Sequence, residues 1–361
     1  MTGGAVVVGG GFAALEIALA LKKQDGSIPV TVITSETEII YRPWLIRVPA
    51  GGPQPPVIPL TRLLEAAGSD VVAGRATAVN LEQRHVLLDS GAQIEYDQLI
   101  VATGAVADRG RVPGTREHAV FPCDLGDAAE FAARVSGGTA HVAVVFGWER
   151  PGPGLEYAAW IAARRPGVRV TAIDGDGTME RRFGAKATTR VRALFERRGA
   201  QLLTEGIVER IGRGTVELRG SAVEADLIAI VAPLRGSSEW LPEALLDKRG
   251  MLRVDSGMVA RAGIFGIGDV VSVPEGYRLP PTLRSIQATA AGVARNVAGA
   301  LRGVATQAVL KPGQPDTMLP DLAGVAVLVR DRRLLLGGRL PLLIRSAAER
   351  RYLRSRSTQK A

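Results

Sequence analysis

Three small residues near the start of the chain have the spacing of a phosphate-binding turn. Gly9, Gly11 and Ala14 form the pattern G-x-G-x-x-A at the end of the apolar run AVVVGG. In such a turn the first glycine permits a sharp bend, the second lets a pyrophosphate approach the backbone, and the small third residue keeps the following helix close to the strand. The N–H groups that begin this helix would face the phosphates, where the helix dipole favours negative charge. The pattern therefore indicates that the chain binds a dinucleotide.

The glycine pattern lies between a predicted strand and a predicted helix, and a second predicted strand follows, as in a dinucleotide-binding βαβ unit. An apolar strand-like run at 5–10 leads into it, AALEIALALKK follows with the apolar spacing of a helix, and VTVIT at 30–34 forms a second strand. In dinucleotide-binding βαβ units, an acidic residue about 20 residues beyond the loop binds a ribose. Thr34 stands near that position and Glu36 lies two residues later. Either Glu36 reaches back around the turn, or Thr34 and Ser35 bind the ribose less strongly, or Glu36 is a solvated loop carboxylate.

Two later segments narrow the identity of the dinucleotide. EYDQLIVATGA at 95–105 reads as a strand that ends in Ala-Thr-Gly, and RAGIFGIGDVV at 261–271 reads as a strand that ends in Gly-Asp. Together with the glycine loop, these motifs make the chain resemble the pyridine nucleotide-dependent FAD oxidoreductases, which are flavoproteins with two dinucleotide-binding domains. The resemblance implies that FAD binds at the first loop. It also implies FAD contacts from four residues of the later motifs: Thr103, Gly104, Gly268 and Asp269.

Two further segments narrow the resemblance to type II NADH dehydrogenases and related sulfide:quinone reductases. YRPWLIRVPAG at 41–51 and LPPTLRSIQATAAGVARNV at 279–297 are similar to segments of those proteins, and the resemblance covers about residues 4–305. We expect these two segments to surround the flavin. Two of their residues would bind FAD and three would lie at its reactive end: Arg42 and Thr282, then Pro43, Arg284 and Gln287.

The second of these segments departs from the family pattern. Where the family has glutamines that help form the quinone end of the flavin site, this chain has Arg284, then Ala288 and Thr289, with Gln287 one step away. Either the acceptor site is altered, or the register is shifted and Gln287 serves instead. Arg42 or Arg284 would stabilise negative charge on a reduced flavin.

Residues 139–174 predict a second βαβ unit, at the place where the family binds NAD(P)H. HVAVVF reads as a strand, GLEYAAWIAARR as a helix, and VRVTAI as a strand that leads to Asp174. The turn from Gly147 to Gly154 is longer than G-x-G-x-x-G. Residues that are bulky or that lack an N–H group stand where a pyrophosphate would press: Trp148, Glu149, Arg150, Pro151 and Pro153.

Two acidic residues of this second unit are predicted to contact the nucleotide. Gly154-Leu155-Glu156 resembles the G-V-E of the family, and Asp174 would accept bonds from an adenosine ribose and repel a 2′-phosphate, which favours NADH over NADPH. Two alternatives follow for the second site. NADH binds there through Gly147, Gly154, Glu156 and Asp174, or the loop is vestigial and packs against the first domain.

The predicted fold is α/β, with two Rossmann-like dinucleotide-binding domains, of which the FAD domain is interrupted by the NAD(P)-type domain. The expected boundaries are 1–112 and 251–305 for the FAD domain, 113–250 for the NAD(P)H-type domain and 306–361 for a short C-terminal segment. The tail LPLLIRSAAERRYLRSRSTQK mixes apolar and basic residues. It is either a peripheral contact with an anionic membrane, a helix packed on the domain, or a homodimer contact.

The composition excludes several classes of protein. No run of about 18 apolar residues is present, as a membrane-spanning helix would need. The single cysteine, Cys123, cannot form an internal disulfide, so a cytoplasmic location is expected, with the inner face of the membrane as the alternative. The net charge of +9 comes mostly from scattered arginines without interleaved aromatic residues, so no nucleic-acid partner is expected. The three histidines show no metal-ligand spacing.

These observations predict an FAD-dependent oxidoreductase that carries electrons from NADH through FAD to a quinone or another small-molecule acceptor. One alternative is a flavoenzyme that oxidises a small organic substrate directly, as in secondary metabolism, with a vestigial nicotinamide site. A second alternative is a flavin-binding sensor without turnover. Hydride transfer from NADH to a flavin requires no acid–base residue, which fits the absence of a recognisable catalytic triad. Cys123 has no partner thiol, so we expect it to carry no redox chemistry.

Overall fold

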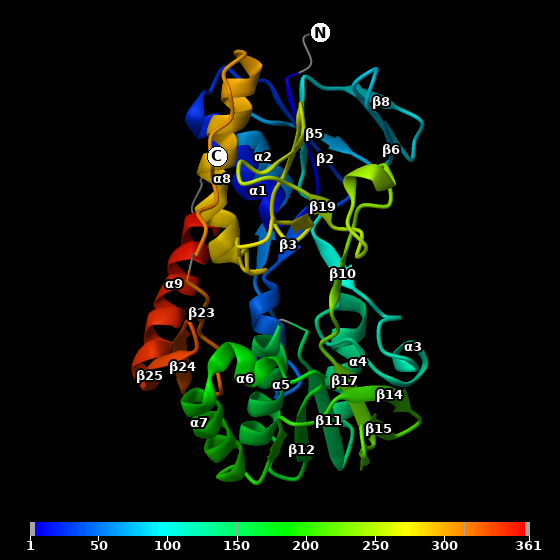
Figure 1. Ribbon diagram of the computed structural model, residues 1–361, viewed down its shortest axis with the longest axis vertical. Helices are drawn as coiled ribbons and strands as arrows, with labels where there is room; N and C mark the ends of the chain where they lie inside the picture. Colours follow the sequence, from blue (N-terminus) through cyan, green and yellow to red (C-terminus); the bar gives the residue numbers. More distant parts are fainter. Residues whose placement is uncertain (1–3, 149, 314, 358–361) are drawn as a thin grey trace.

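A six-stranded sheet lies in the upper half of the molecule (Figure 1). The computed structural model describes residues 4–148, 150–313 and 315–357. The strand order is β20-β21-β9-β1-β2-β5, and all neighbours are parallel except β20 and β21. The strands are β1 (Ala5–Val8), β2 (Val30–Thr34), β5 (Asp70–Ala73), β9 (Gln98–Val101), β20 (Val259–Arg261) and β21 (Ile264–Gly266).

Helices cover this sheet because its central strands are apolar on both faces. Every residue of β1 and all but the first of β9 are apolar and buried, as in parallel strands that lie between helical layers. Helices α1 (Phe12–Gln24) and α8 (Leu283–Leu301) pack along each other and contact the sheet. Both helices carry fully buried alanines, which shortens the distance at which they can pack: Ala14, Ala18, Ala294 and Ala298.

The strand order places two of the sequence motifs side by side. From β1 the chain proceeds outward to β2 and β5, then crosses to β9 on the other side of β1, with β21 beyond it. In open α/β sheets, ligands bind outside the carboxyl ends of the strands. They bind where the chain stops adding strands on one side of the first strand and continues on the other side. Here that point lies between β1, which ends just before Gly9, and β9, which ends just before residues 102–104.

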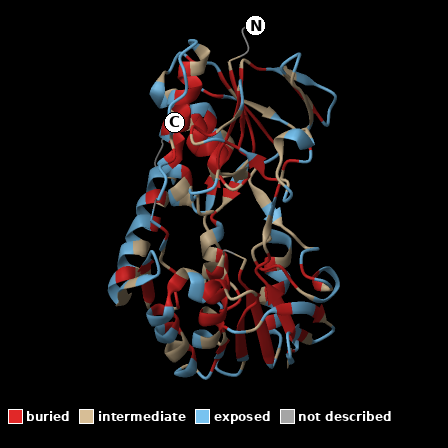
Figure 2. Cartoon of the chain, in the orientation of Figure 1, coloured by how far each residue is buried: buried red, intermediate tan, exposed pale blue. Residues whose placement is uncertain are grey.

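A four-stranded parallel sheet in the order β13-β12-β11-β17 forms the lower half of the molecule (Figure 1). Figure 2 shows that buried residues gather in this sheet as they do in the first. Its strands and helices are β11 (His141–Phe146), β12 (Arg169–Asp174), β13 (Gln201–Leu203), β17 (Leu227–Ile230), α4 (Leu125–Ser136), α5 (Pro151–Arg164), α6 (Thr178–Phe183) and α7 (Ala185–Glu196). The predicted α/β class with two Rossmann-like units is confirmed.

Short elements connect and flank the two sheets. Strands β10 (Ala105–Ala107) and β18 (Leu234–Gly236) pair antiparallel where the chain passes between the two halves. Three-stranded meanders are formed by β6 (Ala76–Asn80), β7 (His85–Leu88) and β8 (Gln93–Glu95), and by β14 (Val208–Gly212), β15 (Thr215–Leu218) and β16 (Ser221–Glu224). The other elements are β3 (Glu38–Ile40), η1 (Arg42–Arg47), β4 (Val57–Pro59), α2 (Leu60–Ala66), α3 (Thr115–His118), η2 (Glu243–Leu245), β19 (Leu252–Arg253) and β22 (Val271–Ser272).

The C-terminal segment forms a small antiparallel sheet and a long helix. The sheet consists of β23 (Thr317–Met318), β24 (Ala326–Arg330) and β25 (Arg333–Gly338), and α9 (Arg339–Ser357) follows it along one side of the molecule (Figure 1). Of the three alternatives for the tail, the structure shows a helix packed on the chain itself, and residues 358–361 lie outside the described part. Within the residues described, no helix is both long and apolar enough to cross a membrane.

Buried ion pairs attach α9 to both halves of the molecule. Near its end, Arg356 donates to the two carboxylate oxygens of Glu16 on α1 at 2.7 and 2.8 Å, and Tyr352 donates to Glu16 at 3.0 Å. Nearer its start, Arg345 pairs with Glu156 of α5, and these two side chains are only 15% and 9% exposed. We call these two contacts the α9 clamp.

Arg345→Met should destabilise the protein strongly. The substitution leaves the Glu156 carboxylate buried without a counter-charge, and breaking a buried pair in this way costs about 3–5 kcal/mol. Urea denaturation measures the loss, and Arg350→Met is the matched control because Arg350 is exposed on the same helix. Adding Glu156→Gln to Arg345→Met should recover part of the stability. Equal losses for the Arg345 and Arg350 variants would contradict the importance of the clamp.

Candidate functional site

The turn after β1 leaves room beside its backbone. Gly9 has a φ of +148°, which favours glycine, and a Cβ there would collide with Ala102 at the end of β9. Gly11 has an ordinary φ of −110°, and a Cβ there would meet no atom within 4 Å. The N–H groups of Gly10 and Gly11 have no hydrogen-bond partner among the described residues. The turn therefore presents free donors beside open space, as phosphate binding requires.

The end of β21 meets this turn directly. A Cβ on Gly268 would lie 2.7 Å from the Cβ of Ala13, in the first turn of α1. Ala14, the next residue of the helix, is fully buried. Because these positions carry small residues, α1 lies close to the ends of β1 and β21. The contact brings Asp269, which follows Gly268, beside the glycine turn.

Two polar side chains at this crevice have no partner in the described protein. Oγ1 of Thr103 is buried without a hydrogen bond, and a Cβ on neighbouring Gly104 would point into open space. Asp269 forms no hydrogen bond or ion pair among the described residues. Burial raises the pKa of its carboxyl, and the nearby charges of Arg150 and Arg42 oppose that rise. Since polar groups in protein interiors are normally satisfied, both side chains indicate a polar ligand.

The end of β2 supports one of the three alternatives for the ribose contact. Oγ1 of Thr34 is buried and accepts a hydrogen bond from the backbone N–H of Glu36 at 2.9 Å. The side chain of Glu36 folds back over the glycine turn, so that a Cβ on Gly10 would lie 2.7 Å from its Cγ. Glu36 itself is exposed. Thr34 is therefore engaged in the local turn, and the geometry favours Glu36 reaching back.

The segment η1 lies beside the same crevice. The Tyr41 ring, which precedes η1, contacts Phe12 edge to face with the ring centres 5.9 Å apart, and this contact ties η1 to the start of α1. Arg42 and Pro43 are its first two residues, and Arg42 is exposed. Arg42 lies near enough to Asp269 to lower the pKa of that carboxyl against the larger effect of burial.

The first turns of α8 also lie at this crevice. Thr282 caps the helix by accepting a hydrogen bond at 3.2 Å from the backbone N–H three residues on. Ile286 is buried against the end of β21, 3.8 Å from a Cβ built on Gly268. Arg284 and Gln287 are exposed on these same turns. The structure thus brings Thr282, Arg284 and Gln287 to the end of β21.

The second turn differs from the first in what surrounds it. Gly147 has a φ of +138°, and a Cβ on it would lie 2.5 Å from Oδ1 of Asp176. A Cβ on Gly154 would lie 2.6 Å from Cγ of Phe146, so Gly154 packs α5 against β11. Gly154 therefore allows close packing of α5 against β11, which is the role of the last small residue in a dinucleotide loop, and its place in an NADH site stays a prediction. Glu149 lies outside the described residues.

Asp174, for which the sequence predicts a ribose contact, is hydrogen-bonded within the protein. Its side chain is fully buried, Oδ1 accepts a hydrogen bond from the backbone N–H of Thr178 at 3.1 Å, and Oδ2 accepts one from Met179 at 2.8 Å. Asp174 therefore caps the start of α6, and its Oδ1 also lies 3.2 Å from a Cβ built on Gly147, beside the second turn. Burial raises the pKa of its carboxyl to about 6.

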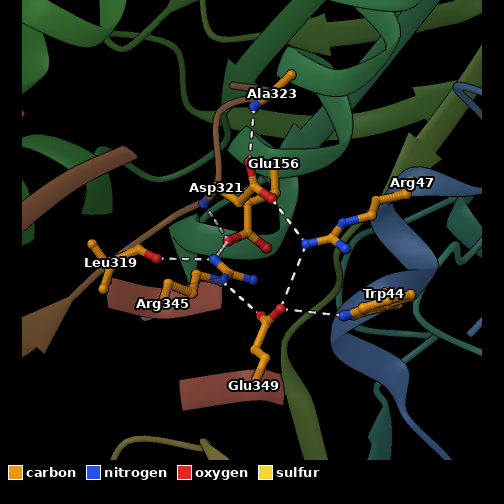
Figure 3. A network of polar contacts seen from close by, with 8 residues as sticks. All are labelled: Trp44, Arg47, Glu156, Leu319, Asp321, Ala323, Arg345 and Glu349. Carbon is orange, nitrogen blue, oxygen red and sulfur yellow. Dashed lines mark hydrogen bonds and ion pairs between the residues drawn. The ribbon is translucent and has the colours of Figure 1, made fainter. Parts of the chain in front are cut away.

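Glu156 is likewise engaged within the protein, as Figure 3 shows. One carboxylate oxygen pairs with Arg345 of α9 and accepts a hydrogen bond from the backbone N–H of Asp321 at 2.7 Å. Arg345 also donates to Glu349 at 3.0 Å. A buried carboxylate must be paired, and α9 supplies the partner. Glu156 therefore has a structural role in the fold, and its contact with NADH stays a prediction.

Residues of η1 complete this network (Figure 3). Arg47 donates to Asp321 at 3.2 Å, and Trp44 donates through its indole nitrogen to Glu349 at 3.2 Å. The Arg47 guanidinium also lies over the Trp44 ring, 4.5 Å from its centre. The network therefore joins η1, which borders the first crevice, to α5 and α9.

Two residues that form important contacts in this region, Asp176 and Arg345, were not identified from the sequence. Asp176 accepts hydrogen bonds from the backbone N–H groups of Trp148 and Thr178, both at 3.1 Å. Its position in the turn-forming triplet Gly-Asp-Gly directly after β12 is a local signal that could have identified it. Arg345 has no such signal, because its partner Glu156 is 189 residues away in the sequence.

Cys123 is a free thiol that packs against the core of the lower half. Burial raises the pKa of the thiol, which opposes the thiolate form that redox chemistry needs. The burial of the thiol supports the expectation that Cys123 has no redox role.

The stability of the wild type should fall, relative to Asp174→Asn, as the pH rises from about 4 to about 6. The unfolded chain loses this proton near the ordinary pKa of 3.8, whereas the folded protein holds it until about pH 6. Stability contributed by the protonated carboxyl is therefore lost through this window, by up to about 3 kcal/mol. Asparagine keeps an accepting oxygen but does not ionise. Urea denaturation of both proteins across the window measures the difference, and a difference independent of pH would contradict this titration.

Comparison with known proteins agrees with this geometry. The family profile described as pyridine nucleotide-disulphide oxidoreductase matches residues 4–292. The ferredoxin–NAD(+) reductase component of the biphenyl dioxygenase system of Paraburkholderia xenovorans is 28% identical over 280 residues, which cover 74% of this chain and 67% of that protein.

Two solved structures share the fold. The sulfide:quinone oxidoreductase of Aquifex aeolicus has a TM-score of 0.85 at 21% identity, covering 98% of this chain and 91% of that chain. NDH2 of Plasmodium falciparum has a TM-score of 0.76 at 13% identity, covering 97% and 94%. The resemblance inferred from the motifs is thereby confirmed, and with it the prediction of an FAD-dependent oxidoreductase linked to a nicotinamide cofactor. The chain belongs to the pyridine nucleotide-disulphide oxidoreductase family.

Proposed function

We propose that the chain carries electrons from NADH, bound at the second Rossmann-like unit, through FAD, bound at the first, to an acceptor that approaches the start of α8. The observation that carries this proposal is the crevice between β1 and β9. It combines the free N–H donors of the glycine turn with two unpartnered side chains, Thr103 and Asp269. When bound, FAD supplies the chemistry, because it accepts two electrons from NADH and releases them singly or in pairs.

The residues of the crevice have distinct tasks in this proposal. The N–H groups of Gly10 and Gly11 bind the pyrophosphate, assisted by the dipole of α1. The exposed carboxylate of Glu36 accepts hydrogen bonds from the adenosine ribose. Asp269 accepts hydrogen bonds from the ribityl chain, and the Thr103 hydroxyl gains the partner that the protein does not give it. Each task gives a hydrogen-bond partner to a polar group that either has no partner in the described protein or is exposed.

The other end of the crevice is electropositive. The N-terminus of α8 carries partial positive charge, and Arg42 and Arg284 add exposed guanidinium groups near it. Positive groups at this place favour the negative charge of a reduced flavin. Pro43 and Gln287 lie next to these two arginines and would border the flavin ring.

The charge of the chain supports an acidic electron-transfer protein as the acceptor. The net charge is +9, and exposed arginines lie at the proposed exit for electrons. Complementary charge accelerates the encounter of protein partners. The biphenyl dioxygenase relative is a ferredoxin–NAD(+) reductase component. We therefore place such a carrier ahead of a quinone as the acceptor of this chain.

We assign the preference for NADH over NADPH mainly to Asp176, whereas the sequence predicts that Asp174 provides it. A Cβ on Gly147 would lie 2.5 Å from Oδ1 of Asp176 and 3.2 Å from Oδ1 of Asp174, so two carboxylates border the second turn. A 2′-phosphate would add further negative charge beside them. The preference thus rests mainly on Asp176, because Asp174 is buried.

NADH should reduce the flavin of the purified protein, and NADPH should do so at least about tenfold less efficiently, a difference of about 1.4 kcal/mol. Anaerobic stopped-flow mixing measures both through the loss of visible flavin absorbance. Gly11→Leu is the control for the FAD site, since its ordinary φ and open surroundings let the variant fold while the new side chain fills the space for phosphate. A Gly11→Leu protein with normal flavin content would contradict the proposal that FAD binds at the first turn. If neither nucleotide reduced the flavin, the proposal that NADH is the electron donor would fail.

A second surface supports a peripheral membrane contact. Four apolar side chains around the start of α9 are more than half exposed: Leu335, Leu340, Leu343 and Ile344. Exposed arginines flank them at Arg332, Arg333 and Arg339. Apolar side chains that enter the interface, with cations beside anionic headgroups, are the pattern of reversible membrane association. We propose that this face contacts an anionic membrane surface.

The wild type should sediment with vesicles that contain anionic phospholipid, and less with vesicles of zwitterionic lipid alone. Replacing Leu340, Leu343 and Ile344 by serine should abolish sedimentation while the melting temperature changes little, because these side chains are exposed. Val304→Ser is the matched control, since Val304 is an apolar residue of similar exposure elsewhere. Concentration-dependent dimerisation that the serine variant loses, without vesicle binding, would assign the face to a second copy instead.

A further inference from the structure

An indole ring covers the place where an adenosine would rest on the second Rossmann-like unit. Two ring carbons of Trp148, Cη2 and Cζ2, lie 3.1 and 3.2 Å from a Cβ built on Gly175. Gly175 is the first residue after β12, so the ring covers the end of that strand. In dinucleotide-binding units, the adenosine lies against the end of this strand. Trp148 is partly buried and packs against the core of the lower half.

A carboxylate takes up donors that a pyrophosphate would use. Oδ1 of Asp176 accepts hydrogen bonds from the backbone N–H groups of Trp148 and Thr178, both at 3.1 Å. The N–H of Arg150 donates to the carbonyl of Gly147 at 2.8 Å, and prolines at the start of α5 offer none. Asp176 therefore provides the second turn with a negative charge from within the chain.

The first turn shows what an open site looks like in the same molecule. The N–H groups of Gly10 and Gly11 are free among the described residues, and the space beside Gly11 is open. In the second turn, the N–H of Trp148 donates to Asp176, the Asp176 carboxylate lies beside Gly147, and the Trp148 ring lies over Gly175. The two βαβ units thus share a backbone plan but differ in whether the chain fills its own ligand site.

We propose that Trp148 and Asp176 form a latch that occupies the adenosine diphosphate half of the NADH site and must be displaced before NADH binds. This inference rests on the proposed function and identifies the residues that control access to its electron donor. Trp148 occupies space and Asp176 supplies charge. Displacement breaks one backbone hydrogen bond and the packing of the indole beside Gly175, so NADH binds through local movement of Trp148.

The backbone of Trp148 is suited to such a movement. It has a φ of +48°, in the left-handed region that side-chain-bearing residues seldom adopt. A tryptophan remains there only while surrounding contacts hold it. The contacts that hold it include the bond to Asp176, the packing beside Gly175 and the packing against the core of the lower half. A bound diphosphate would accept the hydrogen bond that the Trp148 N–H now donates to Asp176.

The test uses ADP-ribose, which contains the adenosine diphosphate half of NADH without the nicotinamide, and isothermal titration calorimetry on the flavin-loaded protein. Trp148→Gly should lower the dissociation constant of ADP-ribose at least about tenfold, because it removes the ring and suits the positive φ. Asp176→Asn should lower it less, because the amide keeps an oxygen for the Trp148 N–H and removes only the charge. Asp247→Asn is the matched control, since Asp247 also accepts two backbone hydrogen bonds in a turn but lies in another part of the chain.

The outcomes test two proposals separately: that Trp148 and Asp176 form a latch, and that NADH is the electron donor. Unchanged or weaker ADP-ribose binding in folded, flavin-loaded Trp148→Gly and Asp176→Asn overturns the latch, and reduction of the wild-type flavin by NADH would still support the donor. Tighter ADP-ribose binding in both variants supports the latch. If NADH then fails to reduce the flavin of either variant, the latch stands and the donor proposal fails. Should Trp148→Gly not fold, Asp176→Asn alone decides, because it leaves the indole contacts in place.

Discussion

The close approach of two strand ends is the constraint on which the first site depends. β1 and β9 pair in parallel, and the chain leaves them in different directions, so their ends border a crevice. The turn after β1 must bend sharply against Ala102, and glycine at position 9 is what permits this. Once the bend is made, the next N–H groups point away from the sheet without partners. The other residues of the site reach the crevice because α1, α8 and η1 pack around this bend.

The second Rossmann-like unit repeats the backbone plan and satisfies its polar groups differently. Asp174 bonds to the start of α6, Asp176 to the second turn, and Glu156 to α9. Each is a carboxylate in or near the interior, where an unpaired charge is costly. In the first unit, Asp269 and Thr103 lack protein partners. The contrast explains why one fold, used twice in a chain, provides one open crevice and one that the chain fills itself.

Local spacing was enough to propose the first site because its residues lie at strand ends and helix starts, and a parallel sheet gathers such positions at one edge. The α/β class followed from apolar runs and helical periodicity in the same way. The protein partners of Asp174 and Glu156 could not be predicted from the motifs that contain these residues. The N–H groups that bind Asp174 become available only when α6 starts where it does, and Arg345 lies 189 residues from Glu156. A sequence motif gives the position of a carboxylate but not the donors that the completed fold brings to it.

The α9 clamp limits how the two sites can move relative to each other. Glu16 lies on α1, which begins at the first turn, and Glu156 lies on α5, which begins just after the second. Rotation of the two halves would strain one of the buried pairs that α9 makes with these helices, and breaking such a pair costs about 3–5 kcal/mol. Release of Trp148 breaks one hydrogen bond from a backbone N–H to a carboxylate, for which about 1.5–3 kcal/mol is typical, and exposes part of the indole that packs against the core. Movement of Trp148 admits a nucleotide without breaking either contact of the α9 clamp, so the two halves stay in place.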